Sequence, residues 1–324
     1  MAISYEYSIG SVRAKEKELL SKADTDAMLA LSDTDSLVAY LRDKGYADGQ
    51  SIDEIINNNR NETVKYISDI VPDPSVFDVF SYVNDAHNIK AIIKGMLSSV
   101  DYTKLIVEPN TVDPEDIVTA VKENKYELLP DYFSDAAKKA YEILAHTADA
   151  RLSDAHIDIA CMRAQLEKAK ETKIEFLIEY IRTDLFYRNV KTAIRACLTG
   201  AQKNFYEDAL FDGLEEFNKH KIIGEALKGI DALLDYLALK DRFRCAEAVE
   251  AYKASPARFE RYCDNLLNSL AIDKCKRAGN GAEAALGFYI ARQTEYRVIH
   301  IIAVGIETAA DAETTRERLR ELYG

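Results

Sequence analysis

Helix-breaking residues are scarce in this sequence, and their scarcity limits what the chain can fold into. The 324 residues include only 13 glycines and 6 prolines, and neither type occurs between Ser153 and Thr199. Glycine and proline interrupt helices most strongly, whereas the abundant Ala, Leu, Glu and Lys favour them. Apolar residues recur with the 3.6-residue helical period almost throughout. We therefore predict an all-α fold, with one long helix, or two separated by a slight bend, between Ser153 and Thr199.

The few interruptions have the character of helix ends. Asp113-Pro114 and Ser255-Pro256 each place a capping side chain before a proline in the first helical position. Other clusters of turn-forming residues predict loops. These predicted loops are Gly45–Gly49, Pro72–Pro74, Glu108–Pro114 and Ala278–Ala282.

Charge and hydropathy exclude several classes of function. The formal net charge is −13, and no basic tail offsets it, which argues against binding nucleic acid through its phosphates. The longest nearly apolar run, Val298–Ile306, is much shorter than the roughly 20 residues that a membrane span needs. The N-terminal residues also lack the pattern of a secretory signal. We expect a cytoplasmic chain with no direct membrane span.

The sequence contains an internal repeat. NIKAIIKGML from Asn88, NVKTAIRACL from Asn189 and VIHIIAVGIE from Val298 align without gaps, roughly 100 residues apart. Each segment has an apolar stripe on one helical face. The stripe consists of Ile89, Ile92, Ile93, Met96 and Leu97 in the first segment, Val190, Ala193, Ile194, Cys197 and Leu198 in the second, and Ile299, Ile302, Ala303 and Ile306 in the third.

Basic residues recur beside the first two stripes. Lys90 and Lys94 match Lys191 and Arg195, whereas the third segment has His300 and Val304 at these positions. A binding surface and an ordinary solvated helix face both fit this pattern, and both interpretations stay open.

A second element also recurs, which strengthens the repeat. Asp35–Tyr46 matches Glu115–Tyr126, and each is predicted to be a short amphipathic helix ending near a tyrosine; a poorer match lies around Leu214. A chain of this length exceeds the roughly 250–300 residues that one core supports. We predict three similar helical sub-domains, residues 1–105, 106–206 and 207–324, with pseudo-three-fold symmetry.

Motifs for catalysis or cofactor binding are missing from the sequence. It has no phosphate-binding GxxxxGK[ST] loop, no HExxH, no GxSxG and no CxxC. Its five cysteines suggest neither a disulfide framework nor a zinc site. We expect no catalytic residues, no cofactor-binding residues and no metal ligands, and therefore not an enzyme.

Three stretches of the chain resemble one known family, the C subunits of the V/A-type ATPases. FLIEYIRTDLFYRNVKTAIR, from Phe176 to Arg195, resembles a helix of that family, and the N-terminal stretch SVRAKEKELLSKADTDAMLALSDTDSLVAYL resembles its opening segment. The C-terminal stretch resembles its closing segment, in which Glu295 matches an acidic residue and Arg316–Leu319 match the end. Val298, His300 and Phe186 depart from the family pattern.

The resemblance implies a rotor component without catalytic activity. Such a subunit, known as d in eukaryotes, is a funnel of three helical domains. It joins the central-stalk subunits of the soluble ATPase head to the proteolipid subunits of the membrane rotor ring. In that setting Lys90, Lys94, Lys191 and Arg195 are candidate stalk contacts, and the chain is peripheral to the membrane through the ring. It would support ATP-linked transport of protons or sodium ions.

A free-standing helical scaffold or adaptor protein is the alternative function. Solenoid adaptors have repeats of roughly 34–45 residues, and the longer period of this chain disfavours that class. The sequence leaves open whether the complex makes or hydrolyses ATP.

Overall fold

The computed structural model describes residues 4–323 and is all-helical within that range, with no strand. The chain divides into two compact units, one made of residues 1–74 and 247–324 and the other of residues 75–246. The first unit therefore contains both ends of the chain. No helix in the described range combines the length and apolar character that crossing a bilayer requires.

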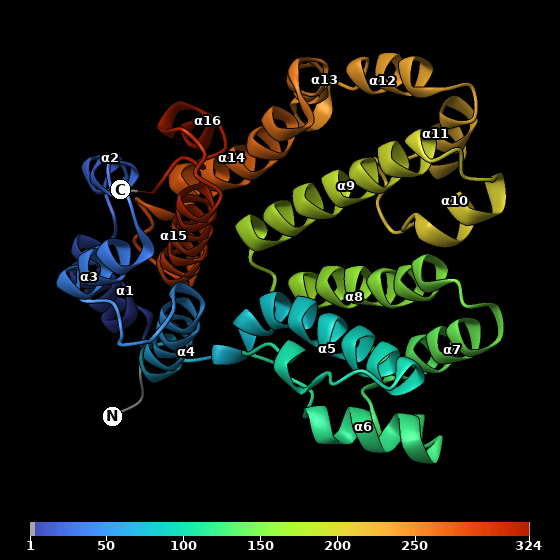
Figure 1. Ribbon diagram of the computed structural model, residues 1–324, viewed down its shortest axis with the longest axis horizontal. Coiled ribbons are helices and arrows are strands. Elements are labelled where there is room, and N and C mark those ends of the chain that lie inside the picture. Colours follow the sequence, from blue (N-terminus) through green and yellow to red (C-terminus); the bar gives the residue numbers. More distant parts are fainter. Residues whose placement is uncertain (1–3, 324) are drawn as a thin grey trace. The chain divides into compact units, whose positions relative to one another are not determined.

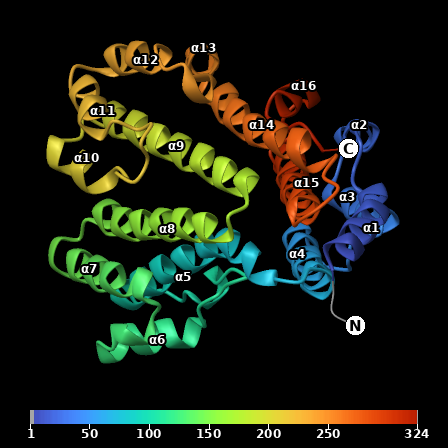
Figure 2. The same cartoon turned by 180° about the vertical axis from the view of Figure 1, so that it is seen from behind.

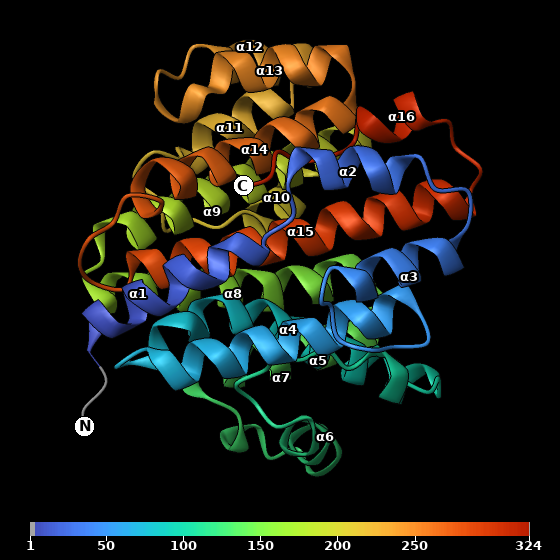
Figure 3. The same cartoon turned by 90° about the vertical axis from the view of Figure 1, so that its left-hand side faces the viewer.

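The first unit is built around its last long helix. It contains α1 (Tyr5–Lys15), α2 (Lys22–Leu29), α3 (Thr34–Asp43), α4 (Ile52–Ile70), α14 (Pro256–Cys275), α15 (Glu283–Glu307) and α16 (Ala312–Arg316). The helices α1, α3 and α4 lie along α15 (Figure 3). One apolar core joins α15 to the N-terminal helices, so residues from opposite ends of the sequence share a hydrophobic interior.

The second unit is a stack of longer helices. It contains α5 (Asp78–Ser98), α6 (Pro114–Glu123), α7 (Asp131–Thr147), α8 (Ala150–Thr172), α9 (Glu175–Leu198), α10 (Lys203–Ala209), α11 (Lys219–Ala226) and α12 (Ile230–Ala238); most of α13 (Cys245–Ala254) belongs to the first unit. The helix α8 packs against α5, α7 and α9 (Figure 1). Seen from behind, α6 lies against α5 on the side away from α9 (Figure 2).

The helix starts predicted from the sequence are confirmed. Asp113 accepts a hydrogen bond from the Glu115 amide at 2.9 Å, with Pro114 as the first residue of α6. Ser255 caps α14 in the same way. The cap side chains satisfy amide groups that the first helical turn leaves without partners. The four predicted loops lie between helices, except for their last residues Pro74, which begins a short 3-10 helix (Pro74–Phe77), and Pro114, which begins α6.

The region between Ser153 and Thr199 differs from the expectation of a slight bend. It forms two helices, α8 and α9, but the chain reverses between them and they pack side by side (Figure 1). The reversal occurs at Lys173, which adopts a left-handed conformation with φ 58°. Glycine or asparagine usually occupies such a position, so a lysine there does not mark the turn.

One carboxylate, Asp24, ties α2 to α3. Its oxygens accept hydrogen bonds from the Tyr40 hydroxyl at 2.8 Å and from the Ser21 amide, and Lys44 lies at 2.6 Å. Burial alone would raise the pKa of Asp24. The hydrogen bonds from Lys44, Ser21 and Tyr40 outweigh burial and hold that pKa well below its ordinary value.

The lowered pKa of Asp24 predicts a pH-dependent contribution to stability. A carboxylate with a depressed folded-state pKa stabilises the fold above its unfolded pKa, about 4, and loses that contribution as the pH falls through the folded pKa. Asp24→Asn should therefore lower the urea midpoint at pH 7, and the difference from wild type should shrink steadily below pH 4. Glu62→Gln, on an exposed stretch of α4, is the control and should match wild type at each pH. If the difference in urea midpoint between Asp24→Asn and wild type stays constant from pH 7 to below pH 4, the charge of Asp24 does not stabilise the fold.

Candidate functional site

The three repeated segments all lie on long helices. Asn88–Leu97 belongs to α5, Asn189–Leu198 to α9 and Val298–Glu307 to α15. Most of each apolar stripe is buried, as predicted. The buried members are Ile89, Ile92, Ile93, Val190, Ala193, Ile194, Ile299, Ile302 and Ala303. The last stripe position is different, because Leu97 is 37% and Leu198 is 62% exposed at the helix ends.

The basic residues of α5 have internal partners. Lys90 lies 2.6 Å from Asp158 and Lys94 lies 2.6 Å from Asp154, both acids being on α8. The two lysines and the two aspartates are each spaced by four residues, so the pairs form two rungs between the helices. These lysines therefore help to join α5 to α8 within the second unit.

The matched positions of the other two repeat helices have different surroundings. Arg195 is exposed, and its Nε donates to the Lys191 carbonyl of the same helix at 3.3 Å. Within residues 4–323, no acidic side chain pairs with Arg195. On α15, His300 lies 3.6 Å from Asp53 and Val304 is 36% exposed. The two-rung pairing seen on α5 is therefore not repeated at the position of Arg195.

Two buried asparagines hold the backbone of the chain that follows each repeat helix. The Asn88 amide donates to the Val107 carbonyl at 3.0 Å and its oxygen accepts from the Val107 amide at 2.9 Å. Asn189 makes the same pair of bonds with Phe211, at 2.8 and 2.9 Å. Both asparagines are fully buried. The repeat thus preserves a two-bond clamp as well as an apolar stripe.

Acidic side chains provide a second clamp, three residues before the start of the repeat. Asp85 accepts hydrogen bonds from the Thr111 and Val112 amides at 2.8 and 3.1 Å and from the Thr111 hydroxyl at 2.6 Å. Glu295 has the corresponding position on α15 and accepts from the Leu20 amide. The corresponding residue of α9 is Phe186, which packs among aromatic rings.

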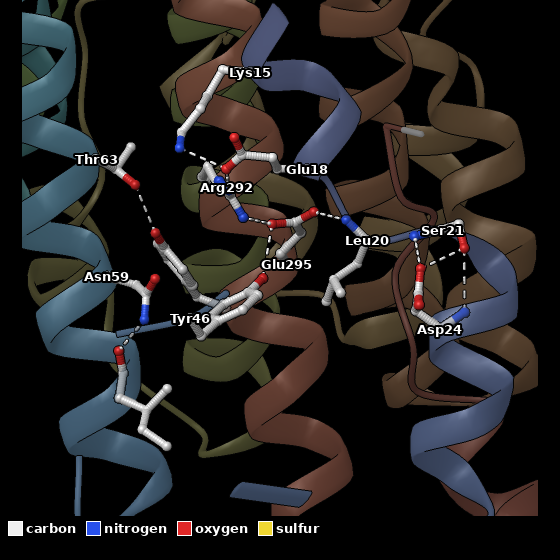
Figure 4. A network of polar contacts seen from close by, with 12 residues as sticks. Lys15, Glu18, Leu20, Ser21, Asp24, Tyr46, Asn59, Thr63, Arg292 and Glu295 are labelled. Atoms are coloured by element: carbon white, nitrogen blue, oxygen red, sulfur yellow. Dashed lines mark hydrogen bonds and ion pairs between the residues drawn. The ribbon is translucent and has the colours of Figure 1, made fainter. Parts of the chain in front are cut away.

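Glu295 is the centre of a buried polar network in the first unit (Figure 4). Its second oxygen accepts from the Tyr46 hydroxyl at 3.0 Å and from Arg292 at 2.8 Å. Glu295 is 2% exposed. The guanidinium of Arg292 also lies over the rings of Tyr46 and Phe288. Three donors from separate parts of the chain therefore meet one carboxylate.

Burial shifts the titration of both clamping acids. It raises the pKa of Glu295, against the opposing charge of Arg292 and the hydrogen bonds from Leu20 and Tyr46. It also raises the pKa of Asp85, against the bonds from Thr111 and Val112. Shifted carboxylates can mark active sites, but structural networks shift them as well. The partners of both acids belong to the chain's own framework, so these acids serve as structural clamps.

The described part of the chain has no group of three or more His, Cys, Asp or Glu side chains that could hold a metal ion. Its five cysteines are free thiols, four buried and Cys197 half-buried. Burial raises the pKa of the Cys161 thiol to about 11, which keeps it protonated and unreactive at neutral pH.

Sequence reasoning missed Asp85, Arg292 and the role of Tyr46. The repeat offered a signal for Asp85, which stands three residues before Asn88 as Glu295 stands three residues before Val298. The Tyr46 contact joins residues separated by 249 positions, so local periodicity could not reveal it.

Repeated long helices, clamped backbone segments and internally bonded carboxylates define a helical structural protein. A family model for the ATP synthase (C/AC39) subunit matches residues 8–318. The chain therefore belongs to the C/AC39 family of ATP synthase subunits. It is also similar to the C subunit of the V-type sodium ATPase of Enterococcus hirae, with 20% identity over 327 residues that cover 96% of this chain and 97% of that protein.

Family membership confirms the function expected from the resemblance. The chain is the C subunit of a V-type ATPase, a central-stalk component of a rotary ion-pumping enzyme, and it is a non-catalytic structural subunit. Its partners are other subunits of that ATPase.

The asparagine clamps predict a large stability loss on replacement. Asn189→Leu keeps the side-chain size but leaves the amide and carbonyl of Phe211 without partners. The loss should cost about 2–6 kcal/mol, since each of the two buried unsatisfied groups costs about 1–3 kcal/mol. Urea unfolding measures this loss. Asn57→Leu, at an exposed position of α4, is the control. A change of less than about 0.5 kcal/mol for Asn189→Leu would contradict the clamp.

Proposed function

We propose that this chain couples the central stalk of the soluble ATPase head to the membrane rotor ring. In this role it transmits rotation and so supports ATP-linked transport of protons or sodium ions. It would lie on the cytoplasmic side, peripheral to the membrane through contact with the proteolipid subunits of the ring. The observation that carries the proposal is the family match over residues 8–318.

The local structure supports a mechanical role. An adaptor that passes torque needs stiffness, and long helices with close-packed apolar faces resist deformation. The helices α8 and α9 have 23 and 24 residues, and buried or paired polar groups join each to its neighbours. The polar contacts that hold α5 to α8 and α9 to the segment after it stiffen the second unit further.

The proposal includes three similar sub-domains with pseudo-three-fold symmetry and a funnel-like arrangement. These sub-domains are residues 1–105, 106–206 and 207–324. The matching contacts of α5 and α9 support it, because both helices carry the same apolar stripe and the same asparagine clamp. A free-standing helical scaffold is the competing function.

Co-purification distinguishes the two functions. With an affinity tag on this chain, native purification from the source membranes should recover ATPase head subunits and ring proteolipids together, identified by mass spectrometry. The tagged chain added to solubilised membranes without prior assembly controls for adhesion. Recovery of the chain alone, or with unrelated proteins, would reject the coupling role and favour the scaffold.

The stalk contact is testable through the repeat. Among the four candidates Lys90, Lys94, Lys191 and Arg195, we assign the contact to α9, because the Arg195 guanidinium is exposed there whereas both α5 lysines are engaged by acids. Reversing Lys191 and Arg195 to Glu should weaken binding to the purified central-stalk subunits by about tenfold at low salt. It should also flatten the salt dependence, because exposed charge pairs are screened by ions.

The matched control reverses Lys90 and Lys94 to Glu. That change opposes Asp158 and Asp154 and should lower the stability of the second unit, measured by urea unfolding, while the salt dependence of binding stays as in wild type. Unchanged affinity after the α9 reversal would remove Lys191 and Arg195 from the stalk contact without affecting the coupling role.

A further inference from the structure

The two matched short elements of the sequence cover equivalent faces of two different repeat helices. In the second unit, α6 and Tyr126 bury their apolar residues against the stripe of α5. In the first unit, α3 and Tyr46 do the same against the stripe of α15. The core residues that these elements contribute match between the copies. One core contains Ile117, Val121 and Tyr126 together with Ile89, Ile92 and Ile93, and the other contains Leu37, Leu41 and Tyr46 together with Ile299, Ile302 and Ala303.

The order of these elements along the chain differs between the two copies. The helix α6 follows α5 directly, and the segment held by Asn189 likewise follows α9 and leads into α11. In the first unit the covering helix α3 lies near the other end of the chain from α15. The helix α9 also contacts α11, so α5 and α9 each pack against a short helix that comes later in the chain, whereas α15 packs against one that comes earlier.

The acidic clamps follow the same order. Asp85 binds the amides of Thr111 and Val112, immediately before α6. Glu295, at the matching position, binds the amide of Leu20, just before α2, and α2 leads into the covering helix α3. Both acids thus fix the entry of the segment that covers their own helix.

We propose that residues 16–46 are the covering segment of the last repeat, supplied from the opposite end of the chain, and that Glu295 is the clasp that closes this junction. The junction belongs to the chain's own architecture and does not depend on the coupling role.

The Glu295 clasp and the Asp85 clamp each accept three hydrogen bonds, but they differ in the chain separation that they close and in the kind of donor. The Asp85 contact closes a separation of 27 residues, whereas the Glu295 contact joins residues 275 apart. Ordering a more distant segment costs more conformational entropy. Asp85 accepts from two amides and one hydroxyl, whereas Glu295 accepts from one amide, the Tyr46 hydroxyl and the charged Arg292, and hydrogen bonds between charged groups are among the stronger ones.

Hydrogen exchange measured by mass spectrometry on the full-length protein tests the clasp. Glu295→Gln should speed amide exchange in residues 22–43 at least tenfold while residues 114–123 exchange as in wild type. Asp85→Asn, the matched change at the same repeat position, should show the reverse. The proposal fails if Glu295→Gln leaves residues 22–43 at the wild-type rate, or if both variants loosen the same segment.

A milder pair of variants covers the case in which loss of Glu295 prevents folding. Tyr46→Phe removes one donor to Glu295 and should speed exchange in residues 22–43 about threefold to tenfold. Tyr126→Phe changes the matching tyrosine, whose hydroxyl makes no hydrogen bond within the described residues, and should leave residues 114–123 at the wild-type rate. If Tyr46→Phe and Tyr126→Phe change the amide exchange rate of their own segments by the same factor, Tyr46 and Glu295 do not form the closing junction.

Discussion

A single kind of interaction organises both units: a buried polar side chain on a long helix binds the backbone of the segment that covers the helix. Such a segment brings its amides and carbonyls out of water, and each must find a partner. An asparagine supplies a donor and an acceptor together, so Asn88 satisfies both groups of Val107 and Asn189 both groups of Phe211. A carboxylate accepts only, so Asp85 binds amides alone among the backbone groups. These bonds fix where each segment begins, and the apolar stripes then fix how its helix packs.

Sequence periodicity predicted the helical fold because each stripe reflects burial on one helix face, which is a local property. The helix starts at Pro114 and Pro256 were predictable for a similar reason, since their caps lie within three residues. The reversal at Lys173 was not predictable from glycine or proline. Ser99 and Ala148 also end helices in the left-handed conformation. Packing of the flanking helices stabilises these left-handed caps against their backbone strain. The identity of the cap residue does not indicate that packing, so the sequence does not predict the cap.

The candidate site was only partly visible in the sequence for the same physical reason. The repeat identified four basic positions, but the partners of Lys90 and Lys94 lie on another helix, 68 and 60 residues away. The four-residue spacing of Asp154 and Asp158 matches the spacing of the two lysines, and this pattern could have suggested the two-rung pairing. Nothing comparable marks Arg195, so matching positions on two repeat helices differ in their contacts because their neighbours differ.

The core that α15 shares with the N-terminal helices bears on how this stalk component resists local unfolding. Chain ends are usually the least stable parts of a domain and open first. Here the N-terminal helices share one core with α15, and Glu295 binds the backbone between α1 and α2. Opening either end would expose that core and leave a buried carboxylate without its donors, which carries a large cost. The helices α2, α3 and α4 and the helix α15 therefore stabilise one another in this core, and neither part opens independently of the other.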